Sequence, residues 1–352
     1  MVTQCERQER EMQMRDDLGI TTKLENGKAY LEFALPEKIG RLLSALQIEI
    51  WEGAEGERLV FHGEYSSEEA DSMTALLLRP HLWDGMRDPY VYLVKAQGRF
   101  RSVEYGEKMG GMEKEEKLDP AEDITGEVEM YWRQELTIYD VRVVEKKGIL
   151  LNEKEFLPHE VVYRLPPQIS DAGTRVEQVR RDLERLVQMG VNVIRLEGTG
   201  TGAEGVNCSE VRTFYSLCRK RGFLTGDLWI RPENLPVYRG LPGETTCQAL
   251  LAADGRTLTE RYYYYQAKWS SEPVLYPVLS TLHRQENGLL SLTIYSNQKK
   301  VVLYVDGVLF LFQSAASGDP EFIFEDIPVA KLPLHLAVEA GNLSISLTVS
   351  KI

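Results

Sequence analysis

The stretch 174–230 alternates helix and strand signals, and this alternation constrains the fold more than any other feature of the chain. Its first helix is predicted by apolar residues at helical spacing with charged residues between them: Val176, Val179, Leu183, Leu186 and Val187. Thr174 and Glu177 form a capping box, which predicts that the helix starts at Thr174. Gly190 follows where a left-handed residue would end the helix. The run 191–196 is then typical of a short buried strand.

The cycle repeats in the second half of this stretch. Asn207 with Glu210 predicts the start of another helix, and Gly222 predicts its end. The run 223–230 is the next predicted strand. Strands separated by helices at this rhythm are expected to be parallel and joined by crossover helices. In such units, functional side chains usually lie at the carboxyl ends of the strands.

Composition narrows the classes of partner. The chain has 352 residues, enough for two or three domains, and 43% of them are hydrophobic. The formal net charge is −13, whereas nucleic acids and anionic membranes recruit clustered positive charge, so neither is an expected partner. The cysteines and histidines show no metal-ligand spacing, so we expect free thiols, no metal and no other cofactor.

The amino-terminal segment and the hydropathy pattern predict a cytoplasmic protein. Residues 1–17 are polar and charged without an apolar core, which argues against a secretory signal. No apolar run is long enough to span a bilayer.

Strand patterns flank the α/β stretch on both sides. Before it, 20–97 alternates apolar and polar residues in short runs between turns, and 104–126 is an acidic insertion with little apolar content. After it, 288–352 contains six further strand-like runs, with Asp306-Gly307 as a two-residue hairpin signal. The fold is therefore predicted to be mainly β with an α/β part.

Four motifs, in this order, resemble the family 2 glycoside hydrolases, the group of β-galactosidases and β-glucuronidases. The sequence PHLWDGMRDPYVY at 80–92 resembles the signature near the end of the family's immunoglobulin-like domain. The segment 148–156 resembles the one that leads into the catalytic barrel. The third motif, 182–196 with 214–222, is similar to the start of the barrel. The fourth, 262–276 with 301–307, is similar to the segment after the barrel and the β-sandwich that follows it.

The resemblance implies the ancestry and the fold of this chain. The chain differs from the family in the parts that carry catalytic activity. The family's barrel has eight strands and carries its catalytic glutamates at the ends of the fourth and seventh. Here about forty residues separate the third predicted strand from the post-barrel segment, and each missing strand–helix unit needs ~30 residues. We therefore predict that both glutamates are missing. The one Asn-Glu pair, Asn152-Glu153, lies in the hairpin predicted at 148–156.

Together these observations predict two immunoglobulin-like β-sandwiches flanking a partial (β/α) barrel remnant. The predicted division is a polar segment, a first sandwich that contains the insertion at 104–126, a truncated barrel and a second sandwich: 1–17, 18–145, 146–245 and 246–352. Three parallel strands cannot close a barrel, so we expect their open edges to be covered. Either 127–144, 262–269 or a second copy of the chain could supply the cover.

Glu197 and Asp227 are the best remaining candidates for acid–base chemistry. Both lie at or near the carboxyl ends of neighbouring predicted strands. Retaining hydrolysis requires two carboxyl groups about 5 Å apart, and adjacent strands could bring such side chains together. The alternative is structural: Glu197 would pair with Arg195 or cap the glycine-rich loop 198–205, and Asp227 would cap a turn. That loop resembles a phosphate cradle only weakly, because it lacks a P-loop ending.

Aromatic side chains could supply a platform for a sugar ring. The candidates are Trp229, Trp269 and 262–265, whose alternative role is to pack the second sandwich against the α/β segment. His159, beside Glu160, is the one histidine near the expected site, and a structural histidine is the alternative.

The leading functional hypothesis is a degenerate glycosidase-like protein without hydrolytic activity that binds carbohydrate or a protein partner. The second hypothesis is a residual β-galactosidase-like hydrolase that uses Glu197 and Asp227. The third is a purely structural or assembly module without a ligand. Under any of the three, a homo-oligomer could cover the open sheet edges.

Overall fold

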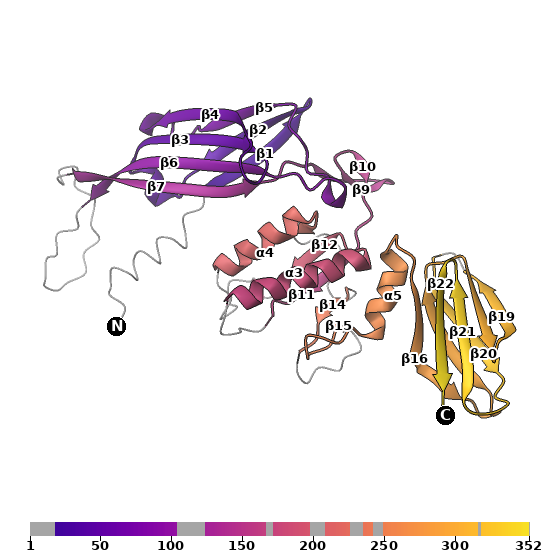
Figure 1. Cartoon of the computed structure of the whole chain (residues 1–352). Coiled ribbons are helices and arrows are strands. Elements are labelled where there is room, and N and C mark those ends of the chain that lie inside the picture. The colour runs from indigo at the N-terminus through magenta and orange to yellow at the C-terminus, as the bar shows by residue number, and fades with distance from the viewer. Residues whose placement is uncertain are drawn as a thin grey trace, which may run out of the picture. The chain divides into compact units, whose positions relative to one another are not determined.

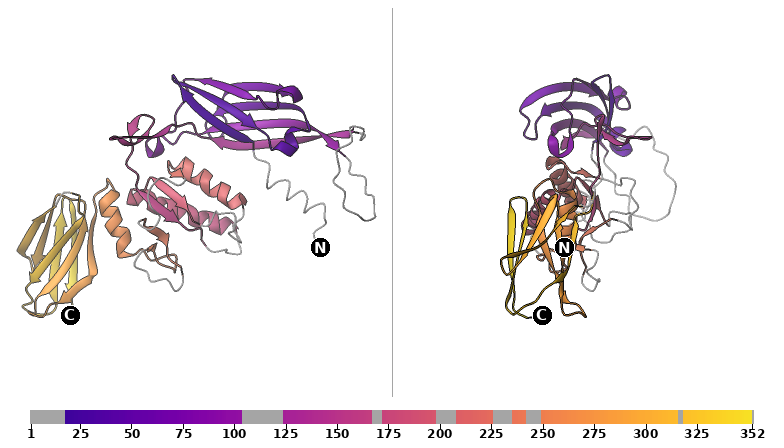
Figure 2. Two further views of the ribbon diagram at one scale, coloured as in Figure 1. Left: turned by 180° about the vertical axis from the view of Figure 1, so that it is seen from behind. Right: turned by 90° about the vertical axis from the view of Figure 1, so that its right-hand side faces the viewer.

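A computed structural model describes residues 18–103, 124–166, 172–197, 208–225, 235–241, 249–315 and 318–351. Contacts divide the chain into two compact units. Unit 1 consists of 1–156 with 207–222, and unit 2 consists of 157–206 with 223–352. Figure 1 labels the elements of both units, and Figure 2 gives two further views of them.

Unit 1 is built on a sandwich of two antiparallel sheets. One sheet has the order β1-β2-β5, formed by Gly19–Glu25, Lys28–Ala34 and Thr74–Leu78. The other has the order β4-β3-β6-β7, formed by Arg58–Ser66, Leu43–Glu52, Tyr92–Val103 and Ile124–Leu136. Side chains alternate between core and solvent along β2, as the period of two requires. This order of strands is immunoglobulin-like and agrees with the prediction for the first sandwich.

The motif at 80–92 connects three parts of unit 1. Trp83 is buried, and its indole nitrogen donates a hydrogen bond to the carbonyl of Arg219 at 3.0 Å. Asn152 Nδ2 donates to the carbonyl of Trp83 at 2.9 Å. Tyr92, at the start of β6, accepts a hydrogen bond from the backbone amide of His81 at 2.6 Å. The motif thus ties the sandwich to a helix and to a hairpin.

The helix and the hairpin have the following bounds. The helix is α4, Cys208–Lys220, which the predicted division assigns to the barrel but which belongs by its contacts to unit 1. Glu135 on β7 holds it through Ser216 Oγ at 2.8 Å and Lys220 Nζ at 2.6 Å. The hairpin is β9–β10, Gly148–Leu151 and Lys154–Glu155, and β9 also pairs with β8, Val141–Val144. Its turn is Asn152-Glu153, with both φ angles positive at 49° and 68°. The predicted hairpin is confirmed.

Three short elements complete the described part of unit 1. They are α2, Glu37–Gly40, and the 3₁₀ turns Ser67–Glu69 and Gly85–Arg87.

Unit 2 contains a parallel sheet of five strands in the order β13-β12-β11-β14-β15. Their bounds are Leu224–Thr225, Val193–Leu196, Glu160–Tyr163, Val237–Arg239 and Ala249–Leu251. The prediction that the α/β segment has three parallel strands is therefore wrong, since β14 and β15 extend the sheet. The two additional strands have three residues each, too few to show a hydrophobic period.

Helix α3, Ala172–Met189, follows β11 and begins two residues before the predicted start. The Thr174–Glu177 capping box is therefore wrong, since both residues lie inside the helix. The predicted end of α3 is confirmed, because Gly190 has a left-handed φ of +87°. Gly222, after α4, has φ +83° and confirms the other predicted end.

Helix α5, Glu260–Trp269, packs against α3 and β15. It therefore covers the β15 side of the sheet, one of the covers expected from the sequence. None of the helices in the described part of the chain is long and apolar enough to cross a membrane.

The second sandwich, also in unit 2, repeats the strand order of the first. One sheet is β16-β17-β20, formed by Leu275–Arg284, Leu290–Ser296 and Glu321–Ile327. The other is β19-β18-β21-β22, formed by Val308–Ser314, Lys300–Val305, Leu334–Ala340 and Leu343–Val349. Asp306 and Gly307 have φ of 49° and 80°, which confirms the predicted two-residue hairpin between β18 and β19. Both sheets bury one face in a shared apolar core.

Candidate functional site

The carboxyl edge of the parallel sheet holds Glu197 in an ion pair. Strands β11 and β12 are in register from Glu160 opposite Val193 to Tyr163 opposite Leu196, so the next residues, Arg164 and Glu197, lie side by side. Arg164 Nε donates to Glu197 Oε2, and its Nη2 donates to Oε1 at 3.3 Å. Arg164 also donates from Nη1 to the carbonyl of Arg239, at the end of β14, at 3.3 Å. Both oxygens of Glu197 are therefore bound by a guanidinium that bridges three strands.

A second ion pair lies deeper in the same two strands. Arg195 Nε is 2.9 Å from Oε1 of Glu160, whose side chain is fully buried. The expected pairing of Glu197 with Arg195 is therefore wrong, since each has a different partner. Asp227 and the glycine-rich loop 198–205 lie outside the described residues.

His159 and Trp269 lie at the other edge of the sheet. His159 directly precedes β11, and its Nδ1 is 2.8 Å from the carbonyl of Gly190. Its ring stacks on Trp269, with ring centres 5.2 Å apart and planes inclined by 7°. Burial lowers the pKa of His159, against the opposing effect of the Gly190 carbonyl. Sugar binding by either ring stays a prediction, as it does for Trp229, which lies outside the described residues.

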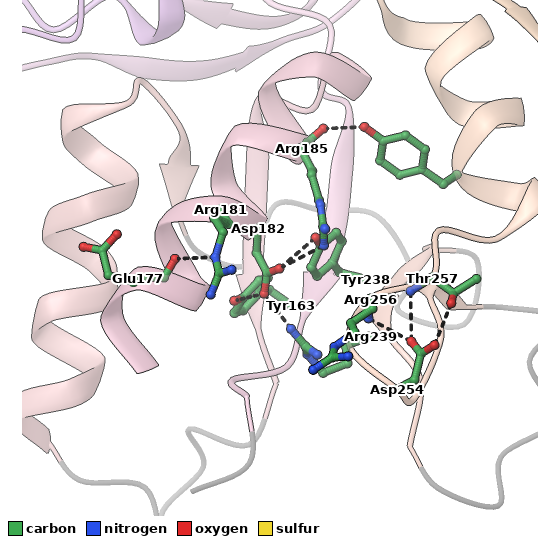
Figure 3. A network of polar contacts seen from close by, with 11 residues as sticks. Tyr163, Glu177, Arg181, Asp182, Arg185, Tyr238, Arg239, Asp254, Arg256 and Thr257 are labelled. Atoms are coloured by element: carbon green, nitrogen blue, oxygen red, sulfur yellow. Dashed lines mark hydrogen bonds and ion pairs between the residues drawn. The ribbon is translucent and has the colours of Figure 1, made fainter. Parts of the chain in front are cut away.

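Asp182 is the centre of a buried polar network between α3 and the sheet (Figure 3). Its Oδ2 accepts hydrogen bonds from the hydroxyl of Tyr163 at 2.9 Å and from Arg239 Nη2 at 2.7 Å. Its Oδ1 accepts one from the hydroxyl of Tyr238 at 3.0 Å. The two tyrosine rings stack with centres 5.4 Å apart, because β11 and β14 are neighbours.

The tyrosines of this network are held as proton donors. Burial raises the pKa of Tyr163 and Tyr238 well above the usual value, and the Asp182 carboxylate raises it further. The network therefore fixes α3 to β11 and β14, because the tyrosine hydroxyls stay protonated and donate to the one carboxylate of Asp182.

A pocket of about 370 Å³ lies beside this network and is called the arginine pocket here. Its lining comes from α3, the end of β14 and the loop after β15: Gln178, Arg181, Asp182, Arg185, Arg239, Ala253, Asp254, Gly255 and Arg256.

The loop after β15 is held in place by Asp254. This carboxylate accepts hydrogen bonds from the amides of Arg256 and Thr257, at 2.8 and 2.9 Å, and from the Thr257 hydroxyl at 2.6 Å. The bonds from Thr257 and Arg256 lower the pKa of Asp254 to about 2.

A larger hollow of about 680 Å³ lies between α5 and the second sandwich and is called the tyrosine cleft here. It is lined by Thr259, Glu260, Arg261, Tyr264, Tyr265, Tyr295 and Glu321. Successive residues of a helix point about 100° apart, so the four tyrosines at 262–265 divide between packing and cleft. Tyr262 is buried and donates to the carbonyl of Arg185 at 2.8 Å, and Tyr263 stacks on Tyr276 with ring centres 3.8 Å apart.

The cleft combines aromatic rings with polar groups. Tyr264 and Tyr295 meet edge to face, with ring centres 5.4 Å apart. Within the described part of the chain, the hydroxyls of these two tyrosines and the carboxylate of Glu321 have no hydrogen-bond partner. Glu260 is occupied, since it accepts from the hydroxyl of Ser280 at 2.6 Å.

The sequence predicts the aromatic wall that α5 contributes to the tyrosine cleft. Residues 262–265 were among the predicted sugar platforms, and two of these four tyrosines line the hollow. Tyr295 and Glu321 come from the second sandwich, and no motif marks them in the sequence. Only the packing of α5 on β17 brings them to the same place.

Similarity to known proteins appears in the three-dimensional structure. No protein-family model matches the sequence, and no curated protein matches it. Solved structures do match. A β-glucuronidase from Facaelibacterium prausnitzii L2-6, described as FMN-binding, is similar with a TM-score of 0.64 and 13% identity, covering 95% of this chain and 73% of its own. A putative β-galactosidase from Bacteroides fragilis has a TM-score of 0.61 and 14% identity, covering 94% of this chain and 72% of its own.

A member of glycosyl hydrolase family 2 from Bacteroides cellulosilyticus DSM 14838 is also similar. Its TM-score is 0.58 at 12% identity, and the match covers 95% of this chain and 62% of its own. The chain has the fold of family 2 glycoside hydrolases. The resemblance seen in the four sequence motifs is thereby confirmed at the level of fold. The chain spans only part of the length of these family 2 structures.

In barrel folds, the groups that perform acid–base chemistry lie at the carboxyl ends of the parallel strands. Among the described residues within three positions of the carboxyl ends of the five strands, two are acidic, Glu197 and Asp254. Glu197 is paired with Arg164, and Asp254 is bonded within its own turn. Neither is arranged as a free general acid or nucleophile in this part of the chain.

Proposed function

We propose that this chain binds carbohydrate in the tyrosine cleft and does not hydrolyse glycosidic bonds. The observation that carries the proposal is the cleft itself, an open hollow with two tyrosine rings from α5 and one from the second sandwich. Aromatic rings with a polar end suit a sugar, whose ring has apolar faces and hydroxyl edges. The volume of about 680 Å³ lies within the ordinary range for small-molecule sites.

The polar groups support a sugar rather than an apolar ligand. The Glu321 carboxylate is an acceptor for sugar hydroxyls, and the hydroxyls of Tyr264 and Tyr295 can donate or accept. Arg261 supplies a cation on the same wall, above the ring of Tyr265 at 5.5 Å. The glycosidase-related fold makes carbohydrate the first ligand to test.

The absence of hydrolysis is proposed from the carboxyl edge of the sheet. Retaining enzymes need a carboxylate nucleophile and a carboxylic acid about 5 Å apart, and inverting enzymes need a base and an acid with a water between them. Glu197 would have to leave a two-point pair with Arg164 before it could serve in either role.

Binding and its dependence on Tyr264 test the site. We expect a galactose- or glucuronate-containing oligosaccharide, selected on a glycan array and titrated by calorimetry, to bind the wild-type protein. Tyr264→Ala is expected to weaken binding about tenfold, because the variant loses the apolar ring surface that a sugar face would bury, at roughly 25 cal/mol per Å². Tyr264→Phe keeps the ring and should lose less. Tyr30→Ala is the matched control, because Tyr30 is an exposed tyrosine of β2 in the other unit.

Two results would contradict the assignment. Absence of saturable binding to any glycan on the array would remove carbohydrate as the ligand. Binding that Tyr264→Ala and Tyr295→Ala both leave unchanged would place the sugar elsewhere.

A further inference from the structure

We infer that the arginine pocket is a binding site for a small dianion, specifically the phosphate group of a phosphomonoester. Four arginines and two aspartates line it, which leaves two positive charges in excess in a chain whose formal net charge is −13. A phosphomonoester carries close to two negative charges at neutral pH and matches this excess. The site is separate from the tyrosine cleft and does not depend on sugar binding there.

The two aspartates are already engaged, so the ligand faces guanidinium groups. Asp182 accepts hydrogen bonds from Tyr163, Tyr238 and Arg239. Asp254 accepts its three bonds from Arg256 and Thr257 within the loop. A carboxylate whose lone pairs are filled by donors presents little acceptor capacity to a ligand.

The guanidinium groups of the pocket keep N–H donors that make no hydrogen bond to the described part of the chain. Arg239 is 4% exposed, and its Nε is buried without a hydrogen-bond partner. Arg181 makes one long hydrogen bond, from Nε to the carbonyl of Glu177 at 3.3 Å, and the side chain of Arg256 has no hydrogen bond or ion pair in the described part of the chain. Burying unpaired donors is costly, and an oxyanion is the acceptor that fits the planar fork of an arginine.

The loop after β15 is shaped to leave room at these arginines. Gly255 has φ +69°, and a Cβ on it would lie 2.6 Å from Arg239 Nη1. A side chain at 255 would therefore press on the guanidinium. The volume of about 370 Å³ exceeds that of a phosphate ion and leaves space for the organic group to which the phosphate is attached.

Titration with inorganic phosphate tests the inference. We expect saturable binding by calorimetry at pH 8 and constant ionic strength, with acetate at least fivefold weaker because it carries a single charge. Arg181→Gln and Arg256→Gln are each expected to weaken phosphate binding at least fivefold, and the double variant to abolish it. Both side chains are exposed, so these variants are expected to fold. Arg180→Gln is the matched control, because Arg180 neighbours Arg181 on α3, pairs with Glu177 at 3.4 Å and does not line the pocket.

Three outcomes would overturn the inference. The first is the absence of saturable phosphate binding to the wild-type protein. The second is phosphate binding by the folded double variant with wild-type affinity. The third is equal affinity for acetate and phosphate. Hydrogen exchange of α3 peptides in each variant confirms that a loss of binding reflects lost contacts and not lost structure.

Discussion

Asp182→Ala is expected to lower the free energy of unfolding of unit 2 by about 3–5 kcal/mol. The substitution leaves Arg239, 4% exposed, as a buried charge without its carboxylate, and removes the acceptor of two tyrosine hydroxyls. Chemical denaturation measures the change. Hydrogen exchange of β11, β12 and α3 peptides assigns it to unit 2, which is needed because a chain of two units need not unfold in one step.

A double-mutant cycle separates the lost interaction from the cost of the orphaned charge. Asp182→Leu combined with Arg239→Met removes both charges, and we expect it to be less destabilised than Asp182→Leu alone. Asp254→Ala is the matched control, because this aspartate also accepts three hydrogen bonds but is exposed, and its loss should be smaller. A cost below about 1 kcal/mol for Asp182→Ala, or additive costs in the cycle, would show that the network does not hold α3 to the sheet.

Gly190→Ala is expected to destabilise the same unit by about 3 kcal/mol or more. Gly190 has φ +87°, a conformation that costs an L-residue about 1–2 kcal/mol. An added Cβ would also lie 2.4 Å from the carbonyl oxygen of Trp269 and 2.8 Å from the amide nitrogen of Ser270. These are backbone atoms at the end of α5, so the helix end must move and the His159–Trp269 stack must move with it.

Gly307→Ala is the control that isolates the cost of the backbone angle. Gly307 has φ +80°, and a Cβ there would meet nothing within 4 Å. Its substitution should cost about 1–2 kcal/mol. The excess for Gly190→Ala, measured by denaturation of both variants, is then the cost of the clash with α5. Equal costs for the two variants would mean that α5 does not pack this closely on the residue.

Sequence signals predicted the turns and helix ends that depend on the conformation of a few neighbouring residues. The hairpin at Asp306-Gly307 and the helix ends at Gly190 and Gly222 depend on backbone angles that glycine and aspartate favour, so they could be found without tertiary information. The short parallel strands β14 and β15 could not. Three-residue strands show no period, and their strand conformation depends on pairing with β11 and with each other.

The two candidate sites show the same limit. Asp182 lies three residues after Val179 and four before Leu186, which places this charged residue on the apolar side of α3. A charged residue on that stripe was a usable signal for a buried network. Arg239, Tyr295 and Glu321 carry no such signal, because their partners come from segments far away in sequence.

The proposed absence of glycoside hydrolysis is tested by measuring the release of 4-nitrophenol from 4-nitrophenyl β-galactoside and β-glucuronide. We expect no release by the purified chain above that of a heat-inactivated sample. Robust, heat-labile release that Glu197→Gln abolishes would contradict it, since Glu197 would then act in catalysis despite its pair with Arg164.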